Sequence, residues 1–171
     1  MLAHFKTITT FFFDVDGVLT DGSIWVLPNG VHARKMNIKD GYALQLAIKK
    51  GYKIIIISGG DSPEVKDRLH KLGIVDIYMK VTDKAALLLS LLTQYQLIAA
   101  ECLYMGDDIP DSKVMPLTGL PCCPADAVPE IKSIATYISP LNGGAGCARD
   151  VIEKVLKLRG DWNEDSLVRA Q

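Results

Sequence analysis

The chain has neither a clear excess of one charge nor a long apolar run. Its 171 residues include 19 basic and 20 acidic side chains, for a formal net charge of −1. A nucleic-acid groove or a polybasic membrane patch needs a positive excess, so we expect neither nucleic acid nor membrane as a partner. No apolar stretch approaches the roughly 18 residues of a membrane span. The opening segment, MLAHFKTITT, lacks the basic start and apolar core of a signal peptide, so we expect a cytoplasmic protein.

Cysteine is scarce, and its spacing excludes the common zinc sites. The four cysteines are Cys102, Cys122, Cys123 and Cys147. Two of them are adjacent and therefore poorly placed to pair with each other, so reduced thiols are the default interpretation. A chain of this length with 49% hydrophobic residues can build one core. We expect a single domain over residues 1–171, with a frayed tail over about residues 160–171.

Apolar segments of strand length alternate with segments that carry helix signals. Strands are predicted at residues 8–14, 53–57, 76–79, 102–105, 120–122 and 136–138, and helices at 40–50, 63–72, 84–95, 111–117, from 128, and 148–159. Strands that alternate with helices imply a parallel sheet with helices on both faces, a Rossmann-like, three-layer α/β fold. Residues 24–27 and 31–35 flank Pro28-Asn29-Gly30, which predicts a β-hairpin inserted after the first strand.

Small or acidic residues follow three of these strands. They are Asp14 and Asp16, Ser58 and Gly59, and Asp107 and Asp108. Ligands of parallel sheets bind outside the carboxyl ends of the strands, so three such ends predict one site. Two carboxylates one residue apart repel each other unless a cation or a proton relieves them. Because Mg²⁺ suits a few oxygen ligands plus a substrate phosphate, the pattern predicts Mg²⁺-dependent phosphoryl transfer.

The residue types allow each candidate a chemical role. Asp14 can act as the nucleophile, and Asp16 can act as general acid to the leaving group and then as base to water. Ser58 offers a hydroxyl to a phosphoryl oxygen, and Gly59 allows close backbone approach. Lys84 opens a helix, where a cation is unfavourable on dipole grounds, and an anion held between it and Asp14 would explain its position.

A second acidic group follows the strand at 102–105. Asp107 is a candidate metal ligand. Asp111 and Asp108 are candidates to orient the metal ligands without binding the metal themselves. Asp108 and Asp111 can equally be ordinary helix caps.

These residues resemble the motifs of a known family. Asp14-Val15-Asp16-Gly17, Ser58, Lys84 and Gly106-Asp107-Asp108-Ile109-Pro110-Asp111 are similar, in order, to the four motifs of the haloacid dehalogenase superfamily. The resemblance spans about residues 8 to 160. It implies Mg²⁺ bound by the side chains of Asp14 and Asp107 and by the carbonyl of Asp16, with an aspartyl-phosphate formed on Asp14. Many members carry a cap domain, but the interval from Asp16 to Asp40 has room only for the hairpin.

Further segments resemble one branch of that superfamily, the 3-deoxy-manno-octulosonate 8-phosphate phosphatases of lipopolysaccharide sugar synthesis. They are residues 16–22, 37–42, 125–127 and 143–146 with Arg149. The resemblance implies a sugar-acid phosphate as substrate, with Gly59, Lys39, Asp40 and Arg149 as substrate-binding residues.

The chain departs from this branch at two positions. Gly60 stands where the branch has an arginine, and Ala145 stands where it often has a charged residue. A nine-carbon keto-sugar acid phosphate or a broader range of sugar phosphates therefore stays open as the substrate.

The resemblance also implies a homotetramer with shared active sites. Hairpins from four subunits would form a barrel, and each subunit would cover its neighbour's site. The alternative is that Ile24, Trp25, Val26 and Leu27 pack on their own subunit.

A signalling receiver domain is the alternative from a different class. Receivers also place acids, a hydroxyl residue and a lysine around Mg²⁺ on an α/β core. A receiver typically carries its phospho-accepting aspartate after the third strand, whereas here the third strand ends near Met79-Lys80 and Asp14 follows the first.

Asp16 also favours phosphate esters over carbon–halogen substrates, because a leaving alkoxide needs a proton. The pattern favours a phosphatase.

Overall fold

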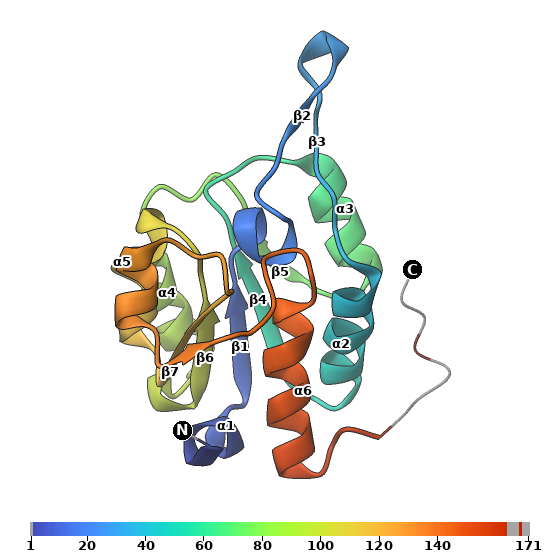
Figure 1. Ribbon diagram of the computed structural model, residues 1–171. Helices are drawn as coiled ribbons and strands as arrows, with labels where there is room; N and C mark the ends of the chain where they lie inside the picture. Colours follow the sequence, from blue (N-terminus) through green and yellow to red (C-terminus); the bar gives the residue numbers. More distant parts are fainter. Residues whose placement is uncertain (1, 164–167, 169–171) are drawn as a thin grey trace.

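A parallel sheet of six strands forms the centre of the computed structural model, which describes residues 2–163 and 168. Figure 1 shows the sheet between its helices. The strands are β1 (Thr10–Phe13), β4 (Lys53–Ile57), β5 (Asp76–Tyr78), β6 (Cys102–Met105), β7 (Leu120–Cys123) and β8 (Tyr137–Ile138). Their order is β5-β4-β1-β6-β7-β8, and all neighbours are parallel. The chain adds strands first on one side of β1 and then on the other. The order therefore reverses beside β1, where doubly wound sheets bind their ligands.

Helices cover both faces of this sheet. One face carries α1 (Leu2–Thr7), α2 (Ile38–Lys49), α3 (Pro63–Lys71) and α6 (Cys147–Arg159), and the other carries α4 (Lys84–Gln94) and α5 (Pro129–Ile134). Side chains of β1 alternate between two cores, with Phe11 and Phe13 in one and Phe12 in the other. The predicted three-layer α/β fold is confirmed. Across residues 2–163, no helix has both the length and the apolar character needed to cross a membrane.

The predicted hairpin projects from the body of the molecule (Figure 1). β2 (Trp25–Val26) and β3 (His32–Ala33) pair antiparallel on either side of a 3₁₀ turn, Pro28–Gly30. Residues 14–37 as the structure describes them hold this hairpin and short turns, with no cap domain. The hairpin therefore stands alone above the carboxyl ends of the strands.

Two short segments differ from the sequence-based prediction. The α-helix expected at 111–117 is replaced by two 3₁₀ turns, Ile109–Asp111 and Met115–Leu117. Pro116 has no N–H to donate and its ring clashes with the preceding turn, which interrupts an α-helix here. α1 was not predicted, because six residues are too few to show a helical period, although Phe5 is buried in the core.

The start of the tail packs against the body. α6 ends at Gly160, which has a φ of 79°. Beyond it, Asp161 accepts a hydrogen bond from the Tyr52 hydroxyl at 2.6 Å, and the ring of Trp162 packs edge-on against Tyr42. Asp161 and Trp162 therefore contact the body of the molecule, and fraying of the tail stays a prediction. The rest of the predicted frayed tail, residues 164–167 and 169–171, lies outside the described residues.

Candidate active site

The carboxyl ends of three adjacent strands deliver polar side chains to one cavity of about 330 Å³. Asp14 follows β1, Ser58 follows β4 and Asp107 follows β6. The predicted residues that line this cavity are Asp14, Asp16, Ser58, Gly59, Lys84, Asp107 and Asp108. Residues spread over nearly a hundred positions of sequence therefore meet at the edge where a parallel sheet binds ligands.

Lys84 is buried between two carboxylates. Its Nζ lies 2.6 Å from Asp14 Oδ2 and 2.8 Å from Asp111 Oδ1. Burial lowers the pKa of Lys84, but the two carboxylates outweigh that effect and raise it, so the ammonium group stays charged. This pairing explains a cation in the first turn of α4. The anions beside the helix start are the two aspartates themselves.

The site is short of positive charge. Burial, with repulsion from Asp111, raises the pKa of Asp14 to about 8, although Lys84 and the N–H of Val15 oppose the shift. Burial, with repulsion from Asp111 and Asp108, likewise raises the pKa of Asp107 to about 7. Two neighbouring acids with raised pKa values are a common mark of a site that receives a cation or a substrate.

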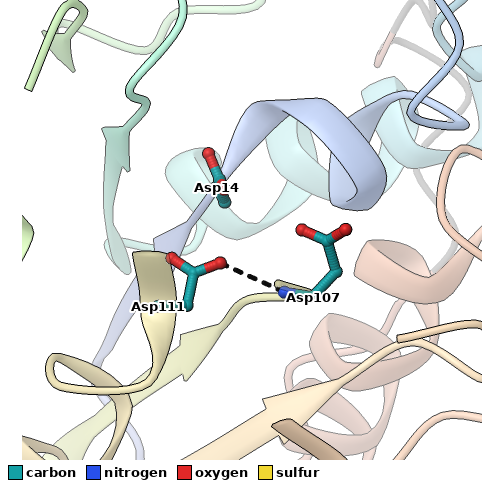
Figure 2. Close-up of side chains that lie close together, drawn as sticks. All are labelled: Asp14, Asp107 and Asp111. Atoms are coloured by element: carbon teal, nitrogen blue, oxygen red, sulfur yellow. Dashed lines mark hydrogen bonds between the residues drawn. The ribbon is translucent and has the colours of Figure 1, made fainter. Parts of the chain in front are cut away.

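Asp107 carries an oxygen that no described residue satisfies. Its Oδ1 is buried and has no hydrogen-bond partner among them. Carboxylate oxygens of Asp14, Asp107 and Asp111 lie within 4.8 Å of one another (Figure 2). Gly17, at a φ of +83°, also lines the cavity and lies against Asp107, since a Cβ at Gly17 would be 1.9 Å from Asp107 Oδ2. A buried acceptor without a donor, facing other carboxylates, fits a hard divalent cation.

Asp111 supports this arrangement from below. It is fully buried, and its Oδ1 accepts hydrogen bonds from Lys84 Nζ and from the Tyr104 hydroxyl, each at 2.8 Å. Its Oδ2 accepts the backbone N–H of Asp107 at 3.1 Å (Figure 2). Because both oxygens are engaged, Asp111 suits a supporting role better than metal binding. Tyr104 was not singled out from the sequence. It could have been, because a tyrosine in a buried apolar strand needs a hydrogen-bond partner for its hydroxyl.

Ser58 and Asp108 also line the cavity. Ser58 is buried, and its Oγ accepts the N–H of Gly60 at 3.1 Å, so its O–H can still donate to a phosphoryl oxygen. Asp108 accepts the N–H of Ile109 at 2.7 Å and caps the 3₁₀ turn that follows. Asp108 thus shapes the loop that carries Asp107.

An arginine that the sequence did not single out holds the carboxylate of Asp16. Arg34 follows β3, and its Nε and Nη2 donate to Asp16 Oδ1 and Oδ2 at 2.6 and 3.2 Å. The Arg34 side chain is 5% exposed, whereas that of Asp16 is 33% exposed. Charged residues are common in hairpin strands, so nothing local marks Arg34 as part of a site.

Three predicted substrate-binding residues lie outside this cavity. Lys39 and Arg149 line a separate cavity of about 680 Å³ beside α6. Asp40 is 2% exposed, and its Oδ1 accepts the backbone N–H of Arg149 at 2.7 Å. Burial raises the pKa of Asp40 to about 6 despite this hydrogen bond. Through Oδ1 the carboxylate of Asp40 therefore anchors the first turn of α6, while its buried Oδ2 has no hydrogen-bond partner among the described residues. Its role in substrate binding stays a prediction.

Comparisons relate the chain to known proteins. A family model described as haloacid dehalogenase-like hydrolase matches residues 70–150. The 3-deoxy-D-manno-octulosonate 8-phosphate phosphatase KdsC of Salmonella typhi is 34% identical over 159 residues, which are 93% of this chain and 85% of that protein. The crystal structure of the phosphatase of the same name from Yersinia pestis is 31% identical and matches 94% of this chain and 86% of its own, with a TM-score of 0.91. The corresponding Moraxella catarrhalis structure, in complex with a magnesium ion, a phosphate ion and a KDO molecule, is 31% identical with a TM-score of 0.91 and matches 94% of this chain and 92% of its own.

Proposed function

The chain belongs to the haloacid dehalogenase-like hydrolases and is a phosphatase, and we propose that it hydrolyses 3-deoxy-D-manno-octulosonate 8-phosphate. The observation that carries this proposal is the cavity where Asp14 and Asp107, which follow β1 and β6, meet Lys84 at the start of α4. Relatives named for this activity match nearly the whole chain, and one of them was solved with magnesium, phosphate and the sugar acid.

We propose that Mg²⁺ is held by the carboxylates of Asp14 and Asp107 and by the backbone carbonyl of Asp16. Two observations support this ligand set: the buried Oδ1 of Asp107 has no hydrogen-bond partner in the part of the chain that the structure describes, and the pKa of Asp14 is raised. When bound, the ion would offset the charge of these carboxylates and of the phosphoryl oxygens.

Asp14 is the proposed nucleophile. Its carboxylate oxygen bonds to phosphorus while the bond from phosphorus to the sugar oxygen breaks, which leaves an aspartyl-phosphate. Asp16 gives a proton to the departing sugar oxygen and then takes one from water. The water oxygen bonds to phosphorus, the bond to Asp14 breaks, and inorganic phosphate leaves. Both carboxylates line the same cavity, as these steps require.

Two further side chains have proposed supporting roles in phosphate binding. Lys84 orients the Asp14 carboxylate through their 2.6 Å ion pair and balances part of the incoming charge. Ser58 donates its hydroxyl to a phosphoryl oxygen, and the backbone at Gly59 comes close to the same group.

A phosphate-release screen with Mg²⁺ tests the substrate. We expect steady turnover of an eight- or nine-carbon keto-sugar acid phosphate well above that of hexose phosphates, loss of activity with a chelator and recovery when Mg²⁺ is restored. Equal or faster turnover of hexose phosphates contradicts the sugar-acid assignment while leaving the phosphatase standing. Retention of one phosphoryl group per chain without steady release is the behaviour of a receiver domain.

We further propose a homotetramer in which the hairpins lie between subunits. The hairpin exposes apolar side chains: Trp25 is 67% and Val26 is 76% exposed. Exposed apolar strands are a liability unless another surface covers them. Lys39 and Arg149, which lie outside their own chain's cavity, are then candidates to face a neighbour's substrate.

Charged substitutions on the hairpin test this assembly. The double variant Ile24→Glu, Val26→Glu should dissociate the tetramer and lower activity together, because two buried charges at an interface are unfavourable. Sedimentation velocity and phosphate release on the same samples measure both. Val75→Glu is the matched control, since Val75 is 81% exposed and lies outside the hairpin. A fully active wild-type monomer contradicts the proposal.

The remaining proposals concern the setting of the protein. We propose a cytoplasmic, single-domain enzyme without a nucleic-acid partner. The near-neutral charge supports the last point, and the four buried, unpaired cysteines support a reducing compartment.

A further inference from the structure

The turn after β1 sets the direction of the peptide group between Asp16 and Gly17. Asp16 has a φ of −73° and a ψ of 122°, and Gly17 has a φ of 83° and a ψ of −5°. These angles are those of the two central residues of a type II turn, which favours glycine at the second of them. Type I and type II turns differ in the direction of the central peptide group, so the turn type decides where the Asp16 carbonyl points.

A buried hydroxyl holds this peptide group in its type II direction. Thr20 is 0% exposed, and its Oγ1 accepts the N–H of Gly17 at 3.3 Å. The peptide bond between Asp16 and Gly17 is trans, so its N–H and its carbonyl point in opposite directions. Asp16 and Gly17 both line the catalytic cavity. The Asp16 carbonyl therefore points away from the buried side chain of Thr20.

Each hydrogen-bonding position of the Thr20 hydroxyl has a partner. A hydroxyl has two acceptor positions and one hydrogen. Oγ1 accepts the N–H groups of Gly17 and Gly22, each at 3.3 Å, and donates to Asp16 Oδ1 at 3.5 Å. The backbone N–H of Thr20 donates to the carbonyl of Val15 at 3.0 Å. The hydroxyl is thus fixed relative to the turn whose peptide group it holds.

A second loop packs against the backbone of the same turn. The N–H of Gly144 donates to the carbonyl of Val18 at 2.9 Å. A Cβ at Gly143 would lie 2.0 Å from the carbonyl oxygen of Gly17, and a Cβ at Gly144 would lie 2.6 Å from the carbonyl carbon of Thr20. These two glycines therefore allow a close approach that leaves the turn little room to move.

We propose that Thr20 is a positioning residue that directs the Asp16 carbonyl toward Mg²⁺. The inference rests on the proposed ligand set, in which that carbonyl binds the ion. Groups that orient metal ligands typically contribute a factor of roughly 10 to 100 to metal affinity. Mg²⁺ demands a nearly ideal octahedron of ligands, whereas Ca²⁺ accepts a flexible one. A carbonyl that is free to rotate therefore weakens the binding of Mg²⁺ more than the binding of Ca²⁺.

The variant Thr20→Val tests this role, because it keeps the shape of the side chain and removes the hydroxyl. Titration calorimetry of the substrate-free protein with Mg²⁺ and with Ca²⁺ measures the two affinities. We expect the Kd for Mg²⁺ to rise by roughly 10- to 100-fold and the Kd for Ca²⁺ to rise by less. Half-maximal phosphate release should require correspondingly more Mg²⁺. Thr20→Ser, which keeps the hydroxyl, should keep both affinities near those of wild type.

Thr118→Val is the matched control. Thr118 is also buried, at 7% exposed, and its Oγ1 donates to the carbonyl of Met115 at 2.9 Å. It precedes β7 and so lies toward the amino ends of the strands, away from the cavity, and both Kd values should match wild type. The titrations are made well below the melting temperature of each variant. If Thr20→Val does not fold, Thr20→Cys takes its place, because a thiol is a weaker acceptor than a hydroxyl.

Three outcomes overturn the proposal. The first is an unchanged affinity for Mg²⁺ in the folded variant. The second is a loss for Ca²⁺ as large as that for Mg²⁺, which a general loosening of the site would produce. The third is a loss in Thr20→Ser as large as that in Thr20→Val, since the hydroxyl is then not the cause. A wild-type protein that binds neither ion overturns the proposed Mg²⁺ site, and one that binds Mg²⁺ but releases no phosphate from sugar phosphates overturns the proposed function.

Discussion

The Asp14→Asn variant is expected to release no phosphate. An amide is a poor nucleophile and a weak ligand of Mg²⁺, so the substitution removes two proposed functions at once. The fold should persist, because the amide side chain has nearly the same shape and can still accept the N–H that Val15 donates at 2.6 Å. Lys84 would keep its second partner, Asp111, at 2.8 Å. The measurements are phosphate release with Mg²⁺ and mass spectrometry of the quenched protein, in which no phosphoryl adduct should form.

The control for this variant is the same chemical change on the surface. Asp67 on α3 is 63% exposed and pairs with Lys71 in the next turn, so Asp67→Asn should match wild type. Residual turnover of Asp14→Asn near the wild-type rate would show that Asp14 is not the nucleophile.

The Asp16→Asn variant is expected to lose about 10²- to 10⁴-fold in kcat, the usual contribution of general acid–base catalysis. Binding of Mg²⁺ should persist, because the proposed ligand is the Asp16 backbone carbonyl, which the substitution leaves in place. Titration calorimetry with Mg²⁺ separates the two effects from each other. A near-normal rate contradicts the acid–base role, and loss of Mg²⁺ binding contradicts the carbonyl as the ligand.

Much of the sheet was predictable because its central strands consist mainly of consecutive apolar residues. The segments at 53–57 and 102–105 have the bounds that the sequence predicts. A strand that is buried on both faces of a parallel sheet is a nearly continuous apolar run, so its position can be predicted from the sequence alone. The α-helix expected at 111–117 does not form, because Pro116 lacks a backbone N–H and its ring clashes with the preceding turn. The spacing of apolar residues alone does not reveal this.

The site residues at strand ends were predictable for the same reason. Asp14, Ser58 and Asp107 each follow a strand, and parallel strands bring their carboxyl ends to one edge. Arg34 and Asp40 were not assigned their observed contacts, because those depend on how the hairpin and α6 pack. The partner of Arg34 lies 18 residues away and that of Asp40 lies 109 residues away. Periodicity and capping rules describe neighbours in sequence and carry no information on such pairs.

The carboxyl cluster at the centre of the site links catalysis to the free energy of folding. Asp14 and Asp111 share one buried lysine, and Asp107 beside them has an oxygen to which no described residue donates. The folded chain therefore concentrates negative charge that the unfolded chain would spread through water, and this repulsion weakens the fold. An ion that binds only the folded chain returns stability by mass action, about 2.7 kcal/mol when its free concentration is a hundred times Kd. The melting temperature of this protein would then rise with the free concentration of Mg²⁺, as would its rate of phosphate release.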